Sequence, residues 1–365
     1  MQVEENSVFE VFQVDRQIHN CVEEGTLYPD VKKSIGKIIK NEGYLTFKIH
    51  VEALTADGGN FLGKLFLVKV TGRTDAGEQE THIFIKQALS EVAFQTHMSM
   101  SEAYLREVFF YTELNALYKK MQTDANIETH EMLKTVKCYD ESSTDAIILE
   151  NLKVKGFNVL FRMDVMSLKF AEAAIKELAK FHALSFVVQK KIPDYFNSKL
   201  KAFKPVLQFN EYFEQFTSKS VKLAIERLDE PVKEKITNNY SDLFSKFAQY
   251  TSDTNLSVNC LCHGDFRANN ILMRENDDAT VEVIPIDYQL IFYGSPITDL
   301  IYLLYTGTDR TFRTNHENDL KELYFQNDIP DFEHLAPNEV DLKIDERYFP
   351  RIAEICDEFE HLLQF

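Results

Sequence analysis

Apolar and polar residues alternate over much of the first 150 residues, and this pattern predicts β-strands. Residues 47–54, 64–70 and 81–86 each have the composition of a strand, because successive side chains of a strand point to opposite faces. A fourth run, residues 146–149, is wholly apolar and is typical of a buried strand. We therefore predict an antiparallel sheet in this part of the chain.

A helical period replaces the alternation in two other segments. In residues 101–111 the side chains of Tyr104, Val108 and Tyr111 recur every three or four positions. A longer stripe runs from Leu168 to Ser185 at the same spacing. The pattern predicts an α+β fold with two lobes, a sheet with one helix in residues 1–150 and a larger, mainly helical part in residues 151–365.

His182 lies on the apolar stripe of the second helix. A histidine in that position is more often a hydrogen-bonded core residue than a catalytic base. We therefore expect His182 to be structural.

Composition narrows the classes of partner. The 365 residues include 58 acidic and 40 basic side chains, a net charge of -18 without a basic patch, so we expect no nucleic-acid partner. No apolar run reaches the roughly eighteen residues of a membrane span, and we expect no membrane partner. The first residues lack the basic and apolar segments of a secretion signal, which favours the cytoplasm.

The five cysteines are scattered along the chain, at Cys21, Cys138, Cys260, Cys262 and Cys356. An odd, irregular set suits free thiols in a reducing compartment. Residues 260–263, Cys-Leu-Cys-His, could form half of a zinc site, but a tetrahedral structural site needs more ligands and no second Cys/His cluster is present in the sequence. We do not predict zinc.

The strongest chemical signal is the segment His263-Gly264-Asp265, with Asn270 five residues after the Asp and Asp287 at the end of an apolar run. Phosphoryl transfer on a kinase-type scaffold needs an Asp that accepts the proton of the attacking hydroxyl, and an Asn and an Asp that hold magnesium. Asp and Asn also serve as ordinary turn residues, but the whole pattern is far rarer than a lone His-x-Asp.

Two short apolar runs on either side of the polar residues 274–279 predict a hairpin. This hairpin would place Asn270 and Asp287 at adjacent strand ends.

Residues 57–63 carry Gly58, Gly59 and Gly63 between the first two predicted strands. Glycines there permit close approach of the backbone to phosphates, although a tight hairpin would use the same residues. Lys86 ends the third strand, and Glu107 on the following helix could pair with it and orient it onto the α- and β-phosphates. The alternative is two solvated charges on separate elements.

The strand at residues 146–149 is followed by Glu150 and Leu152. In kinase-like folds such a strand leads to the hinge, where main-chain groups read the adenine edge. We assign Glu150 and Leu152 to that hinge.

The chain resembles the insect ecdysteroid-kinase-like family, which belongs with choline and aminoglycoside kinases in the wider protein-kinase-like fold. The resemblance extends from the Gly-rich loop through Lys86, the helix that carries Glu107, residues 149–152 with 156–157, and residues 178–183. It continues through the catalytic loop to residues 286–289, 294–296 and 299–300. It implies a bilobal fold, ATP and Mg²⁺ as cofactors, phosphorylation of a small-molecule hydroxyl, and a structural Asp299 that braces the catalytic loop.

One residue departs from the family pattern. The family usually has Trp two residues after the catalytic Asp, whereas this chain has Arg267 there and no Trp at all. A guanidinium could donate bidentately to the γ-phosphate and stabilise its charge in the transition state. An exposed loop Arg paired with a surface carboxylate is the alternative.

Three functions remain in competition at this level. The first is an ATP-dependent O-kinase for a lipophilic alcohol such as an ecdysteroid or a xenobiotic, for which 29 Phe and 16 Tyr offer apolar lining. The second is a kinase for a cationic metabolite such as choline or an aminoglycoside. The third is a catalytically silent binding protein, against which Lys86, Asp265 and Asp287 argue. We expect a monomer that acts on a small-molecule alcohol.

Overall fold

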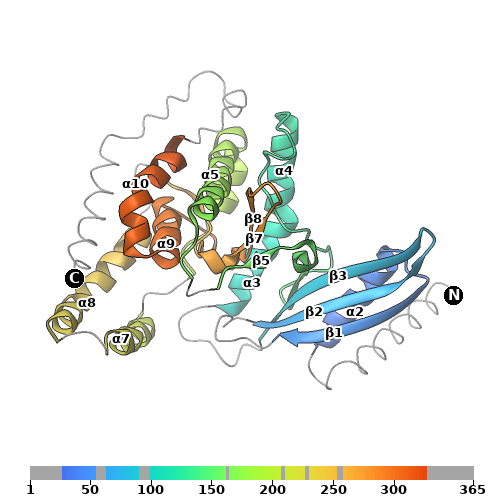
Figure 1. Cartoon of the computed structure of the whole chain (residues 1–365), viewed down its shortest axis with the longest axis horizontal. Helices are drawn as coiled ribbons and strands as arrows, with labels where there is room; N and C mark the ends of the chain where they lie inside the picture. The colour runs from blue at the N-terminus through green and yellow to red at the C-terminus, as the bar shows by residue number, and fades with distance from the viewer. Residues whose placement is uncertain are drawn as a thin grey trace.

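The computed structural model describes residues 27–54, 63–89, 99–161, 164–206, 210–226, 230–252 and 258–326. The sheet β1–β3 occupies one end of the long axis and most helices occupy the other, with α3 and α4 between them (Figure 1). This arrangement confirms the predicted α+β fold.

The four predicted strands form one antiparallel sheet of order β1-β2-β3-β4. Their bounds are β1 Thr46–Leu54, β2 Gly63–Thr74, β3 Gly77–Ala88 and β4 Ala146–Glu150. Alternate residues of β2, among them Phe66, Val68 and Val70, are buried, as the sequence pattern requires.

The buried face of this sheet packs against α2, Pro29–Asn41. Proline at the first turn and Asp30 near the helix N-terminus favour a helix start. The apolar positions Val31, Ile35 and Ile38 recur at helical spacing and are buried against the sheet.

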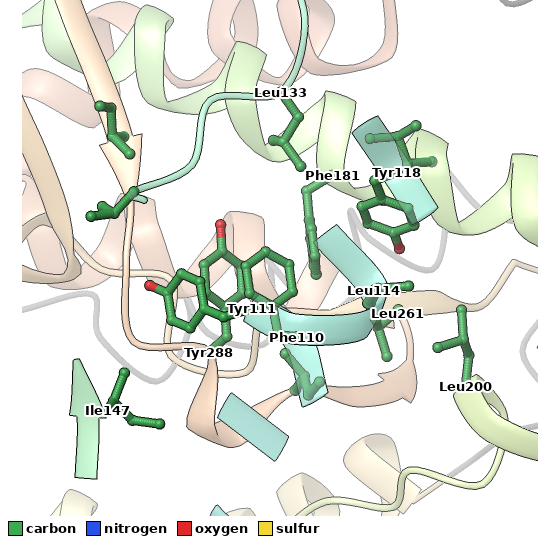
Figure 2. Close-up of a cluster of buried hydrophobic side chains, with 14 of the residues drawn as sticks. Phe110, Tyr111, Leu114, Tyr118, Leu133, Ile147, Phe181, Leu200, Leu261 and Tyr288 are labelled. Atoms are coloured by element: carbon green, nitrogen blue, oxygen red, sulfur yellow. The ribbon is translucent and has the colours of Figure 1, made fainter. Parts of the chain in front are cut away.

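A second core joins the sheet to the helical part. It is built on α3 Met100–Phe109, a π-helical turn η2 Phe110–Leu114, and α4 Asn115–Asp124. Phe110 stacks on Tyr288, and Tyr111 meets the same ring edge-on (Figure 2). Because this core contains Ile147 as well as Phe181 and Tyr288, side chains from both sides of residue 150 share it. The lobe boundary at residue 150 therefore stays a prediction.

The remainder is mainly helical, with α5 at its centre. The helices are α5 Leu168–Lys191, α6 Pro193–Tyr195, α7 Glu211–Ile225, α8 Glu230–Ser252, α9 Ile297–Gly307 and α10 Arg310–Gln326. Helix α5 contacts β8, β6, α9 and α10. Among the described residues, no helix combines the length and apolar character needed to cross a membrane.

Two small antiparallel sheets carry the candidate catalytic segments. One has the order β5-β7-β8 and the other pairs β6 with β9. Their bounds are β5 Asn158–Val159, β6 Cys260–Cys262, β7 Ile271–Glu275, β8 Val281–Pro285 and β9 Phe292–Gly294. The predicted hairpin between Asn270 and Asp287 is confirmed, with its polar turn between β7 and β8.

Candidate active site

The catalytic loop leaves β6 through a glycine that no other residue could replace. Gly264 has φ +82°, and a Cβ built there would lie 2.2 Å from the carbonyl oxygen of Leu290. Glycine alone adopts this conformation without steric cost. The chain can therefore turn sharply immediately before Asp265.

Asp299 fastens this turn from the first turn of α9. Its Oδ2 accepts a hydrogen bond from the His263 amide at 2.6 Å and its Oδ1 accepts one from the Gly264 amide at 2.8 Å. His182 Nε2 lies 3.0 Å from Oδ2, and His182 Nδ1 lies 2.6 Å from the Tyr324 hydroxyl. Since a carboxylate can only accept, Nε2 carries the proton. The predicted structural roles of His182 and Asp299 are confirmed.

His263 ties the loop to the end of β8. Its Nε2 donates to the Ile286 carbonyl at 3.0 Å, and its Nδ1 accepts from the Asp265 amide at 3.3 Å. Burial lowers the pKa of His263. The ring is therefore a neutral connector whose two nitrogens are both engaged.

Asp265 is buried, and its carboxylate faces an amide, a hydroxyl and a guanidinium group. Asn270 Nδ2 donates to its Oδ2 at 2.7 Å, the Tyr302 hydroxyl interacts with it, and Arg267 Nε lies 3.2 Å from its Oδ1. Burial raises the pKa of Asp265 to about 6, although the Arg267 charge opposes the rise. A carboxylate with a pKa near 6 can accept a proton more readily than an ordinary Asp.

Arg267 lies at the rim of this group, with 32% of its side chain exposed. Its Nε approaches Asp265 closely enough for an ion pair but makes no hydrogen bond. The structure therefore places the guanidinium beside the candidate base, and its contact with a γ-phosphate stays a prediction.

Asn270 and Asp287 lie side by side because the Ile286 amide donates to the Asn270 carbonyl at 2.9 Å. Asp287 adopts a left-handed backbone conformation, φ 70° and ψ 59°. For a residue other than glycine this costs about 1 kcal/mol or more and often marks a functional position. The turn directs the Asp287 carboxylate toward Lys86.

Lys86 is buried and its ammonium is surrounded by acceptors. Nζ lies 2.8 Å from Glu107 Oε2, 2.6 Å from Asp287 Oδ1 and 2.7 Å from Gln289 Oε1. Burial lowers the affinity of this site for a proton, but the charges of Asp287 and Glu107 outweigh burial, and the pKa of Lys86 is raised. Burial also raises the pKa of Glu107, against the Lys86 charge.

The predicted Lys86–Glu107 pair is therefore confirmed, whereas the contacts with Asp287 and Gln289 were not predicted. The one sequence signal for Gln289 is its position two residues after the metal-binding candidate, in the stretch Ile286-Asp287-Tyr288-Gln289.

Gly63 is the first residue of β2 and lies beside this cluster. A Cβ at this position would lie 2.5 Å from the Tyr104 hydroxyl and 3.3 Å from Lys86 Cγ, so the glycine permits close packing beside Lys86. Gly58 and Gly59 lie outside the described residues.

The two hinge candidates follow β4. The Glu150 amide donates to the Lys137 carbonyl at 2.9 Å, and its carboxylate pairs with Lys155 at 2.7 Å. Leu152 is buried and begins the 3-10 turn η3, Leu152–Lys155. The Glu150 amide is thus already engaged, and a main-chain contact with adenine would have to come from other groups of this segment.

Asn270 and Asp287 fit a magnesium ion. The Asn270 amide nitrogen donates to Asp265, so Oδ1 is the atom of this side chain that can bind a cation. Asp287 adds a carboxylate, and a hard divalent cation prefers such oxygen ligands. Lys86 and Arg267 carry two positive charges against three carboxylates, Glu107, Asp265 and Asp287. The excess of one negative charge favours the binding of a cation.

Zinc is not supported. The structure brings His182, rather than His263, within 4.8 Å of the thiols of Cys260 and Cys262. Both His182 nitrogens are engaged, and burial raises the pKa of both thiols. A tetrahedral structural zinc site needs four ligands, whereas this group offers three and its imidazole nitrogens already contact Asp299 and Tyr324.

Comparison with known families agrees with this geometry. The model of the ecdysteroid kinase-like family matches residues 57–335. The chain belongs to the ecdysteroid kinase-like family. Membership identifies a small-molecule kinase with an alcohol group as acceptor. No curated protein matches the chain.

Solved structures of low sequence identity are also similar to this family member. The GDP and kanamycin complex of APH(2")-IIia has 15% identity and a TM-score of 0.42, covering 80% of this chain and 86% of its own. A Plasmodium vivax ethanolamine kinase has 13% identity and a TM-score of 0.39, covering 76% of this chain and 68% of its own.

Proposed function

We propose that this protein transfers the γ-phosphoryl group of ATP to a hydroxyl of a lipophilic alcohol, such as an ecdysteroid or a xenobiotic. One observation carries the proposal: Lys86, Glu107 and Asp287 meet within hydrogen-bonding distance, although 201 residues separate Lys86 from Asp287. Such a cluster binds and orients triphosphate groups in kinases.

Asp265 is the group that would receive the hydroxyl proton. Its carboxylate is held by Asn270, and its raised pKa of about 6 makes it a stronger base than an ordinary Asp while it stays ionised at neutral pH. In this proposal, Asp265 orients the acceptor hydroxyl and takes its proton as the oxygen attacks.

The residues proposed to bind the cofactors have separate roles. Lys86, oriented by Glu107, would contact the α- and β-phosphates, and the loop with Gly58, Gly59 and Gly63 would cover them. Asn270 and Asp287 would hold Mg²⁺, which neutralises phosphate charge when bound. Main-chain groups near Glu150 and Leu152 would contact the adenine.

Exposed apolar side chains beside the catalytic loop favour a lipophilic acceptor. Val159, Phe161 and Val165 are 49%, 62% and 48% exposed. Val159 belongs to β5, which contacts the turn of Asn270. Val165 precedes Met166, whose amide donates to the Gly307 carbonyl of α9. An exposed apolar group beside a polar site is typical of a binding surface.

We also propose the cytoplasm as the compartment, since Cys138, Cys260 and Cys262 are free thiols.

A direct test incubates the protein with ATP, Mg²⁺ and a panel of steroids, plant phenolics and amino alcohols. Mass spectrometry then identifies any acceptor that gains one phosphoryl group. We expect phosphorylation of the lipophilic members, and phosphorylation of amino alcohols alone would favour the cationic-metabolite alternative. Nucleotide binding without transfer to any acceptor would favour a silent binding protein.

Asp287→Asn tests the proposed role of Asp287 in binding the metal. It should weaken nucleotide binding in the presence of Mg²⁺ and have much less effect in EDTA, because it removes a charged ligand from a hard cation. Equal weakening in both buffers would argue against the assigned metal role.

A further inference from the structure

Gln289 contacts both the candidate phosphate-binding lysine and the candidate metal-binding aspartate. Its Oε1 accepts from Lys86 Nζ at 2.7 Å, and its Nε2 lies 3.4 Å from Asp287 Oδ2 as a donor. The side chain is buried, with 5% exposed. A primary amide can accept from a cation and donate to an anion at the same time, which neither a carboxylate nor an apolar side chain can do.

Gln289 is held by its neighbours on both sides. Tyr288 is fully buried and stacks on Phe110 (Figure 2). On the other side, the Ile291 carbonyl accepts from the guanidinium of the buried Arg106 at 2.6 Å. These contacts attach the short turn η6, Tyr288–Leu290, to the helix α3 that also carries Glu107 and to the turn η2 that follows it. The packing of this turn therefore places Gln289 within hydrogen-bonding distance of Lys86.

An ammonium group has three N–H donors, and all three have acceptors here: Glu107, Asp287 and Gln289. A phosphate oxygen can therefore reach Lys86 only if one acceptor leaves. Glu107 is 2% exposed and sits on packed helix α3. Asp287 is the acceptor with a competing use, because its carboxylate would also hold the cation.

We propose that Gln289 is a positioning residue. Together with Glu107, it holds the Lys86 ammonium in place when the Asp287 carboxylate leaves that ammonium and binds the metal. This inference rests on the proposed function. With two acceptors retained, Lys86 stays in place and one N–H group becomes available to phosphate. Without Gln289, release of Asp287 would leave the buried ammonium with Glu107 alone among these three acceptors, a costly state.

The inference predicts opposite effects of two substitutions on the Mg²⁺ dependence of nucleotide binding. Gln289→Leu removes an acceptor, so Lys86 holds Asp287 more strongly and the Mg²⁺ concentration for half-maximal nucleotide binding should rise about tenfold. Gln289→Glu retains an acceptor and adds a negative charge beside Asp287, so that concentration should fall severalfold. The measurement is a Mg²⁺ titration of the binding of a fluorescent ATP analogue.

Gln122→Leu is the matched control for the loss of a buried glutamine. Gln122 lies in α4, where it accepts from the Leu133 amide at 2.8 Å and donates to the Tyr118 carbonyl at 3.1 Å, away from Lys86. This variant should lower the melting temperature without moving the Mg²⁺ midpoint. If Gln289→Leu does not fold, Gln289→Met removes the same polar groups with a more flexible side chain.

Unchanged Mg²⁺ midpoints in both Gln289 variants, or shifts in the same direction, would overturn the inference about Gln289. Mg²⁺-dependent nucleotide binding by the wild type would still support the proposed function in that case. If the wild type itself showed no Mg²⁺-dependent nucleotide binding, the proposed function would fail and the role of Gln289 with it.

Discussion

The catalytic loop and the Lys86 cluster are built in contrasting ways. In the loop, Asp265 is oriented by Asn270 five residues away, and its amide is bound by His263 two residues away. In the cluster, Lys86 meets Glu107, Asp287 and Gln289, which are 21, 201 and 203 residues distant. The side chain of Asp265 is therefore oriented largely by contacts within the loop, although Asp299 of α9 and the Ile286 carbonyl also hold that loop. The cluster exists only when sheet, helix α3 and strand β8 have assembled.

Their electrostatics differ as well. Burial raises the pKa of Asp265 to about 6 despite Arg267, so this carboxylate remains able to accept a proton. At the cluster, Asp287 and Glu107 raise the pKa of Lys86 against burial, so the lysine remains charged. In the proposed reaction Asp265 gains a proton, whereas Lys86 keeps its proton while it binds phosphate. Neighbouring charges therefore need to offset burial less at Asp265 than at Lys86.

The largest expected effect comes from Asp265→Asn. The substitution keeps the shape but removes the proton acceptor, so phosphorylation should fall by about two to four orders of magnitude. Because nucleotide binding is assigned to the Lys86 cluster in the proposed function, the dissociation constant of the nucleotide should hardly change. Steady-state kinetics and nucleotide titration test the two statements, and full turnover by the variant would disprove the assigned base.

The cluster should respond as one unit. Lys86→Met and Glu107→Gln should each lower turnover, by about a hundredfold for the lysine. The double variant should lose less than the sum of the two free-energy losses, because each single substitution already disables the pair. A double-mutant cycle on kcat/KM measures this coupling. Strictly additive losses would mean that the 2.8 Å ion pair does not act in catalysis.

Arg267→Ala tests the role of the guanidinium group that lies beside Asp265. If the guanidinium stabilises the γ-phosphate in the transition state, kcat should fall about tenfold or more while the KM of the acceptor stays nearly unchanged. Arg274→Ala is a matched control, since Arg274 is ion-paired with Glu282 at 2.6 Å on the neighbouring hairpin. An unchanged kcat with a raised acceptor KM would instead place Arg267 in the acceptor site.

The smallest expected effect is on stability. Asp265 has an ordinary pKa of 3.8 when unfolded and about 6 when folded, so its ionisation disfavours the folded state as the pH rises through 6. In EDTA, Asp265→Asn should therefore raise the free energy of unfolding by up to about 3 kcal/mol at pH 8, and by progressively less toward pH 4.

Asp277→Asn, on the exposed turn between β7 and β8, provides the comparison for that stability measurement. Denaturant unfolding at both pH values should show no pH-dependent gain for this control. A gain for Asp265→Asn that is equal at pH 4 and pH 8 would contradict the raised pKa.

Sequence reasoning identified the strands, the hairpin, helix α3 and the residues of the catalytic loop, because these features depend on periodicity and short spacing. It also paired Lys86 with Glu107. The structure does not describe Gly58 and Gly59, and it leaves the nucleotide contacts of Glu150 and Leu152 as predictions.

Gln289 illustrates what the sequence could not supply. Nothing in a glutamine beside Asp287 and Tyr288 says whether it faces solvent or a buried lysine 203 residues away. Likewise, the sequence indicates that Lys86 needs a partner but not that Asp287 is one in this structure. The packing of the sheet, α3 and η6 against one another determines which side chains surround the Lys86 ammonium.

The sequence by itself determined the local elements and the types of reactive group, since alternation, helical period and short spacing act within a few residues. Only the tertiary structure decided which charged groups lie in contact and how strongly each of them is buried. Both depend on distances between distant segments, and these distances set the pKa of Asp265 and the three acceptors of Lys86.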